Sequence, residues 1–341
     1  MAATHPGSGY NARPGNEGAK MTKTGQLLAI AAAAMTMLLG ASSLAAVPPQ
    51  RTQAPGYYRM MLGDFEVTVL SDGTFPLKAA EILANVTPKE LETSLSRAFL
   101  KDPIEESVNG FLINTGSKLV LVDSGAGSFF GPTVGKLLKS LEASGYRPEQ
   151  VDEIYITHMH LDHIGGLLAD GKIAFPNATV RTAQQEADHW LSKEKMDAAP
   201  KESKDAFEGA IKVFAPYTAA GKLKPFNGDT ELVPGVRAVA AAGHTPGHTV
   251  YVIESKGEKL VLWGDLMHVA AVQFPDPAVT IRFDTDPNAA AAVRKKIFAD
   301  AAEQREWVGG AHLSFPGVGH LRAAGSGYSF VPINYSSLLL H

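Results

Sequence analysis

Alternating hydrophobic and polar residues divide the chain after residue 50 into short strands separated by turn residues. Residues 65–70 alternate and are followed at 71–73 by Ser-Asp-Gly, which predicts a strand that ends in a turn. Residues 110–114 and 118–122 flank Thr-Gly-Ser and predict a hairpin. A second series of strands is predicted at residues 236–240, 249–254 and 259–263.

Three other segments have helical patterns. Residues 133–144 predict an amphipathic helix that Gly145 ends, and residues 182–195 and 288–306 predict two more. Residues 151–156 form a short apolar strand that runs directly into a cluster of histidines. Strands with interspersed helices and no internal repeat predict one α/β domain, built from two sheets with helices outside.

The composition fits a globular protein, with 45% hydrophobic and 19% charged residues. The net charge of -4, with no run of Lys or Arg, argues against a nucleic-acid partner and favours a small, largely uncharged one. The sequence contains no cysteine. Disulfides, thiolate nucleophiles and cysteine-based metal sites are therefore excluded, and any metal ion must be held by His, Asp or Glu.

The N-terminal region has two parts. Residues 1–20 are rich in Gly, Pro and Asn and are interpreted as disordered or as a mis-assigned start. Residues 21–46 resemble a signal peptide, with an apolar stretch at 27–40 and small residues at 43–45. The apolar stretch is short for a spanning helix, so no stable membrane insertion is expected, and an uncleaved anchor is the alternative. The mature domain would be residues 47–341, in the periplasm or secreted.

A dense cluster of metal-binding residue types follows the strand at 151–156. Its members are His158, His160, Asp162 and His163. His158 and His160 are two residues apart, so in an extended backbone they point in the same direction. If the chain then turns into a helix, the other two reach a second position close by. One ion cannot use all four groups comfortably, whereas two neighbouring ions can, and imidazole with carboxylate favours zinc or a similar ion.

Three later residues complete a ligand set, each where a predicted strand meets a loop. His244 begins the segment His-Thr-Pro-Gly-His, Asp265 follows an apolar strand, and His312 follows Gly-Gly-Ala. An isolated histidine such as His189 has no such context and is interpreted as an ordinary core or surface residue.

Together these motifs resemble the metallo-β-lactamase superfamily, which implies an αββα sandwich with two metal ions at one sheet edge. The resemblance implies one set of ligands for each ion: His158, His160 and His244 for the first, and Asp162, His163 and His312 for the second. Asp265 would bridge both ions. His248 matches a family histidine that is not a ligand, and it would orient a ligand or its loop.

Four segments, at residues 54–68, 114–127, 152–167 and 311–336, resemble more narrowly the methyl parathion hydrolase group. This group includes relatives that act on lactones and aryl esters. The resemblance implies two divalent ions per chain, zinc first, with manganese, cobalt or iron as alternatives. A hydroxide shared by the two ions would be the nucleophile, with Asp265 and Asp162 as catalytic residues and Asp162 as the candidate proton shuttle. The resemblance also suggests a homodimer.

The same resemblance implies a substrate pocket lined by Leu83, Phe130, Trp190, Phe207, His268, Ile281 and Phe283. Its aromatic members suit a flat aryl group. His268 stands where the phosphotriesterases have an aliphatic residue, and Leu83, Ile281 and Phe283 are bulkier or more apolar than their counterparts. Such a pocket favours a planar cyclic or aryl ester over a tetrahedral phosphotriester.

The expected function is therefore hydrolysis of lactones and aryl esters of the dihydrocoumarin kind, with weaker organophosphate triester hydrolysis. One alternative is a dedicated methyl parathion hydrolase. The other is a periplasmic metal-binding protein without turnover. A nuclease is disfavoured by the acidic balance of the chain and by the export signal.

Overall fold

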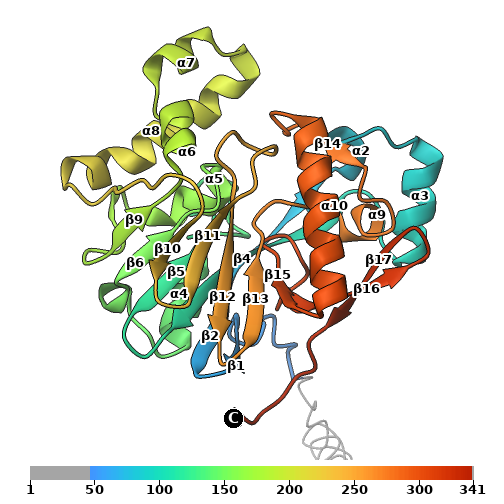
Figure 1. Cartoon of the computed structure of the whole chain (residues 1–341), viewed down its shortest axis with the longest axis horizontal. Helices are drawn as coiled ribbons and strands as arrows, with labels where there is room; N and C mark the ends of the chain where they lie inside the picture. The colour runs from blue at the N-terminus through green and yellow to red at the C-terminus, as the bar shows by residue number, and fades with distance from the viewer. Residues whose placement is uncertain (1–46, 340–341) are drawn as a thin grey trace, which may run out of the picture. The chain divides into compact units, whose positions relative to one another are not determined.

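Two β-sheets packed face to face form the centre of the fold (Figure 1). The structure is a computed structural model that describes residues 47–339, and the signal-peptide prediction lies outside them. Residues 47–52 belong to a separate unit and have no regular secondary structure, whereas residues 53–339 contain all the elements below. No helix in the described part of the chain is long and apolar enough to cross a membrane.

The first sheet has six strands in the order β1-β2-β4-β5-β6-β9. Their bounds are Tyr57–Leu62 (β1), Phe65–Leu77 (β2), Ile104–Asn114 (β4), Leu119–Val122 (β5), Glu153–Tyr155 (β6) and Thr179–Arg181 (β9). Successive side chains of a strand point to opposite faces. Leu119 and Leu121 accordingly pack under the helices, while Val120 and Val122 pack against the second sheet.

The second sheet has seven strands in the order β10-β11-β12-β13-β15-β16-β17. Their bounds are Thr230–Val233 (β10), Val236–Ala240 (β11), Thr249–Ser255 (β12), Glu258–Leu262 (β13), Trp307–Gly309 (β15), Val318–Ala324 (β16) and Gly327–Pro332 (β17). Leu260 and Leu262 face the first sheet, and Val261 between them faces a helix.

Helices cover the outer face of each sheet. The first sheet is covered by α4 (Leu137–Ala143), α5 (Leu161–Ile164), α6 (Gln184–Trp190) and α8 (Lys204–Ala219). The second sheet is covered by α10 (Pro287–Gln304), whose Phe298 packs against Trp263 with ring centroids 5.2 Å apart. The layers therefore follow the order helix, sheet, sheet, helix, and the predicted αββα sandwich is confirmed (Figure 1).

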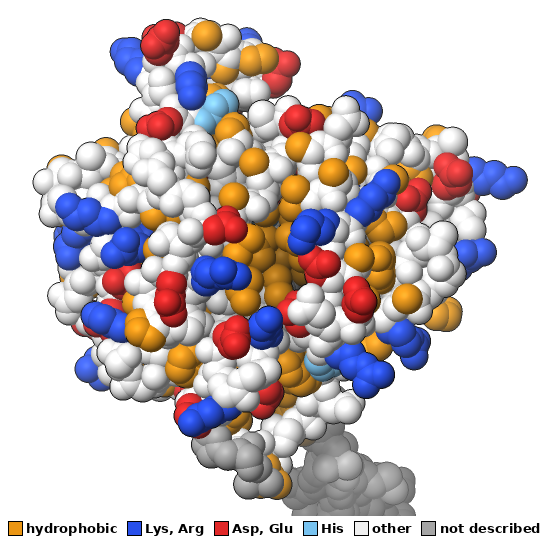
Figure 2. Space-filling view, in the orientation of Figure 1, with side chains coloured by type: hydrophobic (Ala, Val, Ile, Leu, Met, Phe, Trp, Pro, Cys, Tyr) orange, Lys and Arg blue, Asp and Glu red, His pale blue; other side chains and the backbone are white. Residues whose placement is uncertain are grey.

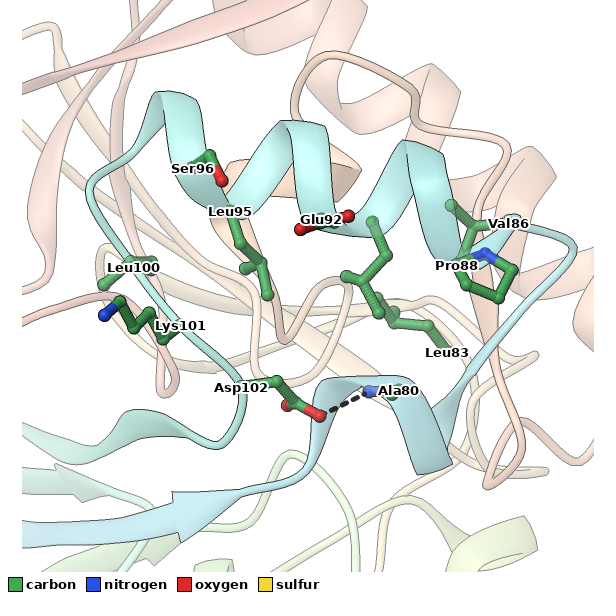
Figure 3. Close-up of a pocket in the computed structure, with 11 residues that line it drawn as sticks. Ala80, Leu83, Val86, Pro88, Glu92, Leu95, Ser96, Leu100, Lys101 and Asp102 are labelled. Carbon is green, nitrogen blue, oxygen red and sulfur yellow. Dashed lines mark hydrogen bonds between the residues drawn. The ribbon is translucent and has the colours of Figure 1, made fainter.

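A smaller hydrophobic cluster packs at the C-terminal end of β2 and the N-terminal end of β4. It comprises α2 (Ala79–Ile82), β3 (Leu83–Ala84), α3 (Pro88–Arg97), α9 (Ala270–Gln273) and β14 (Thr280–Ile281). Leu83 and Leu95 line an apolar cavity of about 430 Å³ between α2 and α3 (Figure 3). The remaining elements are β7 (Leu168–Ala169), β8 (Lys172–Ile173), α7 (Lys193–Ala198) and 3-10 turns at Pro148–Gln150, Gly165–Leu167 and Lys201–Ser203.

The prediction that the strand at 65–70 ends in a turn is wrong. β2 continues to Leu77, with an irregular register between Ser71 and Gly73 where it pairs with β4. A bulge of this kind leaves one residue unpaired and redirects its side chain. Here the redirected residue is Asp72, which is buried and faces the loop between β5 and α4.

Asp72 also explains why the helix predicted from residue 133 begins only at Leu137. The Asp72 carboxylate accepts hydrogen bonds from the backbone N–H groups of Ala126 (3.0 Å), Gly135 (2.8 Å) and Leu137 (2.9 Å). These contacts hold residues 133–136 in a loop. Propensity is a weak guide where tertiary contacts compete for the same backbone groups.

The helix predicted at 182–195 is two helices, α6 and α7. The break falls at Ser192, whose hydroxyl accepts the Lys195 N–H at 3.2 Å and starts α7. The helix predicted at 288–306 is confirmed as α10, which begins where the Asp286 carboxylate accepts two backbone N–H groups.

Candidate metal centre

The loops that follow β6, β11, β13 and β15 meet at one edge of the two sheets. They bring together all seven ligands expected from the sequence, in two groups that share Asp265. Site 1 consists of His158, His160, His244 and Asp265. Site 2 consists of Asp162, His163, His312 and Asp265. Within each group, one ligand atom per residue lies within 4.8 Å of all the others.

In site 1, three imidazole nitrogens converge. His160 Nδ1 lies 3.0 Å from His158 Nε2 and 3.1 Å from His244 Nε2. Asp265 Oδ2 lies 3.4 Å from the Nε2 atoms of both His158 and His244. His160 thus presents Nδ1, whereas the other two histidines present Nε2.

Site 2 has a similar arrangement around the other oxygen of Asp265. Asp265 Oδ1 lies 3.1 Å from His163 Nε2 and 3.2 Å from His312 Nε2. Asp162 Oδ2 lies 3.6 Å from His163 Nε2 and 3.3 Å from His312 Nε2. One oxygen of Asp265 therefore faces each site.

This donor set fits two metal ions. A tetrahedral zinc ion with bonds of about 2.0–2.1 Å places its donor atoms about 3.3 Å apart. The separations of these donor pairs, 3.0–3.4 Å in site 1 and 3.1–3.6 Å in site 2, lie around that value. In addition, His163 Nε2 and Asp265 Oδ1 are buried and form no hydrogen bond. Polar atoms buried in this way are costly unless they have a partner.

Asp123, which follows β5, orients a ligand of site 2. Its Oδ2 accepts a hydrogen bond from His163 Nδ1 at 2.9 Å, and its two oxygens also accept the N–H and hydroxyl of Thr157. Asp123 has a left-handed backbone (φ 58°), which Asp tolerates better than most residues. Such a partner fixes the tautomer of the histidine and directs Nε2 at the metal.

Replacing Asp123 by asparagine is expected to weaken zinc binding by about 10–100-fold, the usual effect of losing such a partner. The amide has one oxygen acceptor, so it cannot accept from His163, the Thr157 hydroxyl and the Thr157 N–H together as the carboxylate does. Zinc affinity would be measured by competition with a chromophoric chelator. Asp170→Asn, an exposed position that already has a left-handed backbone, is the control. Unchanged affinity in folded Asp123→Asn would contradict this role.

Other ligands have buried partners of the same kind. His244 Nδ1 donates to Asp284 Oδ1 at 2.9 Å, and His312 Nδ1 donates to the Ser107 carbonyl at 2.9 Å. His248 does not join either group, and its Nε2 accepts the backbone N–H of Asp265 at 3.1 Å. It therefore holds the loop that carries the shared carboxylate.

The carboxylates and imidazoles shift one another's pKa. Burial lowers the pKa of His163, but the carboxylates of Asp265, Asp162 and Asp123 outweigh it and raise that pKa well above the usual value. Burial and the nearby His244 lower the pKa of His160 to about 3. Metal ions bind neutral imidazole, so a proton held on His163 must leave when an ion binds, and binding weakens in acid.

The residues expected to line a substrate pocket fall in several places. Trp190 packs edge-on against the His160 ring with centroids 5.3 Å apart, and Phe207 packs on Trp190 at 4.7 Å. The Phe130 ring instead contacts Phe75 at 5.4 Å and is 42% exposed. These contacts place Trp190 and Phe207 beside site 1, with Phe130 on another loop.

Of the remaining expected pocket residues, His268 contacts the metal centre, and the other three lie on or beside β14. His268 Nε2 donates to Asp265 Oδ2 at 2.9 Å, and its ring stacks on His312 with centroids 5.0 Å apart. Ile281 pairs through its backbone with Leu83, whose side chain lines the cavity beneath α3 (Figure 3). Phe283 is 54% exposed and directly precedes Asp284.

Comparisons with known proteins agree with this geometry. A family model described as the metallo-beta-lactamase superfamily matches residues 103–304. The chain is 37% identical in sequence to hydrolase AbOPH of the β-lactamase superfamily, whose crystal structure is known. The match covers 84% of this chain and 100% of the AbOPH chain, with a TM-score of 0.80. AidC, a dizinc quorum-quenching lactonase solved in complex with a product N-hexanoyl-L-homoserine, is 30% identical. The match covers 83% of this chain and 99% of the AidC chain, with a TM-score of 0.77.

An N-acyl homoserine lactonase from Bacillus cereus is 26% identical over 151 residues, or 44% of this chain. The match spans about half of that lactonase, 52% of its length. The family model covers more than half of this chain, and the chain covers nearly all of AbOPH and AidC. The protein therefore belongs to the metallo-β-lactamase superfamily, and its relatives include hydrolases.

Proposed function

We propose that the protein is a binuclear metal-dependent hydrolase of lactones and aryl esters. The observation that carries this proposal is the position of Asp265, which presents one oxygen to each of two histidine-rich sites. The similarity to a dizinc lactonase over 83% of the chain supports lactones as substrates. Zinc is the proposed metal, because imidazole and carboxylate ligands at these separations suit it.

When bound, two such ions supply an activated water and a positively charged contact for the substrate carbonyl. The residues of the chain hold the geometry that this chemistry needs. Asp265 is 2% exposed and spans both sites, so it fixes their separation. The Asp162 side chain is 12% exposed and lies at the more open side of site 2. Asp162 is therefore the residue proposed to pass a proton to an alkoxide leaving group, on the carboxylate oxygen that does not face site 2.

The surroundings of the sites favour a flat, uncharged substrate. Trp190 and Phe207 form an aromatic wall next to His160. Figure 2 shows one face of the molecule, on which acidic and basic side chains are mixed rather than gathered by sign. A planar ring that stacks on an aromatic wall fits such surroundings better than an anionic polymer does. Dihydrocoumarin and aryl esters are the proposed substrates, with organophosphate triesters hydrolysed more slowly.

A substrate panel on metal-quantified protein tests the proposal. Dihydrocoumarin, an N-acyl homoserine lactone, phenyl acetate and methyl parathion would be compared by kcat/KM. We expect at least one lactone or aryl ester to exceed methyl parathion. N-acyl homoserine lactones are in the panel because AidC and the Bacillus cereus relative are lactonases. A triester rate well above all the lactone rates would instead favour a dedicated organophosphate hydrolase.

Replacing His268 by leucine is expected to shift this preference toward triesters. The change removes the hydrogen bond to Asp265 and leaves an aliphatic surface against His312. A change of one side chain in a pocket typically alters the discrimination between two substrates by about 10–200-fold. We therefore expect the ratio of lactone to triester kcat/KM to fall at least about tenfold. An unchanged ratio would remove His268 from the account of specificity.

The alternative of a metal-binding protein without turnover predicts two bound ions but no hydrolysis of any panel member. Two further properties complete the proposal. Export to the periplasm after cleavage near Val47 would be checked by the mass and N-terminal sequence of the mature protein. A homodimer would be checked by light scattering.

A further inference from the structure

Glu186 is a buried carboxylate that no step of the proposed chemistry uses. It lies in the first turn of α6 and is 0% exposed. Its Oε1 accepts the backbone N–H of Met159 at 2.8 Å, and its Oε2 accepts the backbone N–H of Gly247 at 2.8 Å. One side chain therefore joins two backbone segments that are far apart in the sequence.

Both segments carry ligands of site 1. Met159 lies between His158 and His160 on the loop after β6, in the first sheet. Gly247 lies three residues after His244 on the loop between β11 and β12, in the second sheet. A backbone hydrogen bond from Thr249 N to Thr157 O, at 2.9 Å, joins the bases of the two loops. Glu186 adds the link nearer to the ligands.

A glutamate and a glycine are both required for this contact. Only a carboxylate offers two oxygen acceptors in a fixed fork, while glutamine would turn an N–H₂ group toward one of the two N–H donors. A Cβ atom on Gly247 would lie 2.4 Å from the Glu186 backbone nitrogen, so the loop approaches α6 closely only with glycine there. Trp190, one turn further along α6, packs on the His160 ring.

We propose that Glu186 is a positioning residue that fixes the spacing between the two loops of site 1 and thereby sets the metal affinity of that site. The inference rests on the proposed binuclear centre and adds a residue that controls one half of it. The relevant spacing is the 3.1 Å between His160 Nδ1 and His244 Nε2. The loop after β6 also leads into Asp162 and His163 of site 2, but Asp123 orients His163 and the Ser107 carbonyl orients His312, so the effect on site 2 is smaller.

The test is zinc affinity, measured by competition with a chromophoric chelator, in Glu186→Gln. His312→Ala weakens site 2 and leaves site 1 to be measured, and His244→Ala does the reverse. In the His312→Ala background, Glu186→Gln is expected to weaken zinc binding by about 10–100-fold. In the His244→Ala background it is expected to change affinity by less than about threefold, because Glu186 bonds to Met159 and Gly247 and not to the groups that orient His163 and His312.

Asp188→Asn is the matched control, since Asp188 is an exposed carboxylate on the same helix. Glu186→Asp, which keeps both oxygens on a shorter arm, is expected to fall between wild type and Glu186→Gln, and it replaces Glu186→Gln if that variant does not fold. Equal losses at both sites, or no loss at either, would overturn the proposal. Failure of the proposed function would look different, as wild-type protein that binds two ions and hydrolyses nothing.

Discussion

Replacing Asp265 by asparagine is expected to lower kcat/KM on the best lactone by more than about 100-fold, beyond the 10–100-fold loss typical of residues that only support a ligand. The carboxylate meets His158 and His244 through Oδ2 and His163 and His312 through Oδ1. Asparagine keeps one oxygen and presents an N–H₂ group to the other site. Steady-state kinetics together with the number of ions bound per chain would measure the effect.

Asp64→Asn is the control for this substitution, because Asp64 is exposed at the turn between β1 and β2 and its side chain forms an exposed ion pair with Lys256, at 3.1 Å. It should leave both activity and metal content unchanged. Activity of Asp265→Asn within tenfold of wild type would show that the two sites do not need a shared carboxylate.

The second large effect is expected on stability, at a buried arginine of α10. Arg294 is 1% exposed. Its guanidinium donates to the carbonyls of Leu266, Pro277 and Val279 and lies 3.9 Å from Asp284 Oδ2. The arginine thus stabilises the segment from Leu266 to Asp284, and Asp284 is the carboxylate that orients His244.

Arg294→Met is expected to lower the free energy of unfolding by about 3–5 kcal/mol, the usual cost of removing one partner of a buried charged pair. The methionine fills part of the volume but leaves Asp284 without its buried cation and removes the guanidinium donors from three carbonyls, of which that of Val279 keeps Gln273 Nε2. Urea unfolding of metal-free protein would measure the change without a contribution from metal binding. Arg322→Met on the exposed side of β16 is the control, and a loss below 1 kcal/mol at Arg294 would contradict its stabilising role.

The ligands of the metal centre could be predicted from the sequence because they are marked locally. His158, His160, Asp162 and His163 fall within six residues, and the resemblance to the metallo-β-lactamase superfamily adds His244, Asp265 and His312. Strand ends at one edge of a sandwich lie close together, so residues at several such ends can be predicted to form one site. Their roles still rest on the proposed chemistry, which the experiments above address.

The residues that orient the ligands could not be predicted in the same way. Asp123, Glu186 and Asp284 are single acidic residues without a distinctive motif, and each acts on a ligand or loop from a different part of the sequence. The loop after β5 illustrates the same limit. Its length depends on Asp72, which lies on a strand more than fifty residues earlier in the numbering. Such contacts follow from packing rather than from local pattern.

The most direct test of the account is to measure metal content and turnover on the same sample. We expect about two divalent ions per chain, which is the stoichiometry that the two donor groups predict. Removal of the ions by a chelator should lower dihydrocoumarin turnover by at least about 100-fold, and added zinc should restore it. Undiminished turnover by protein shown to be free of metal would contradict the central claim.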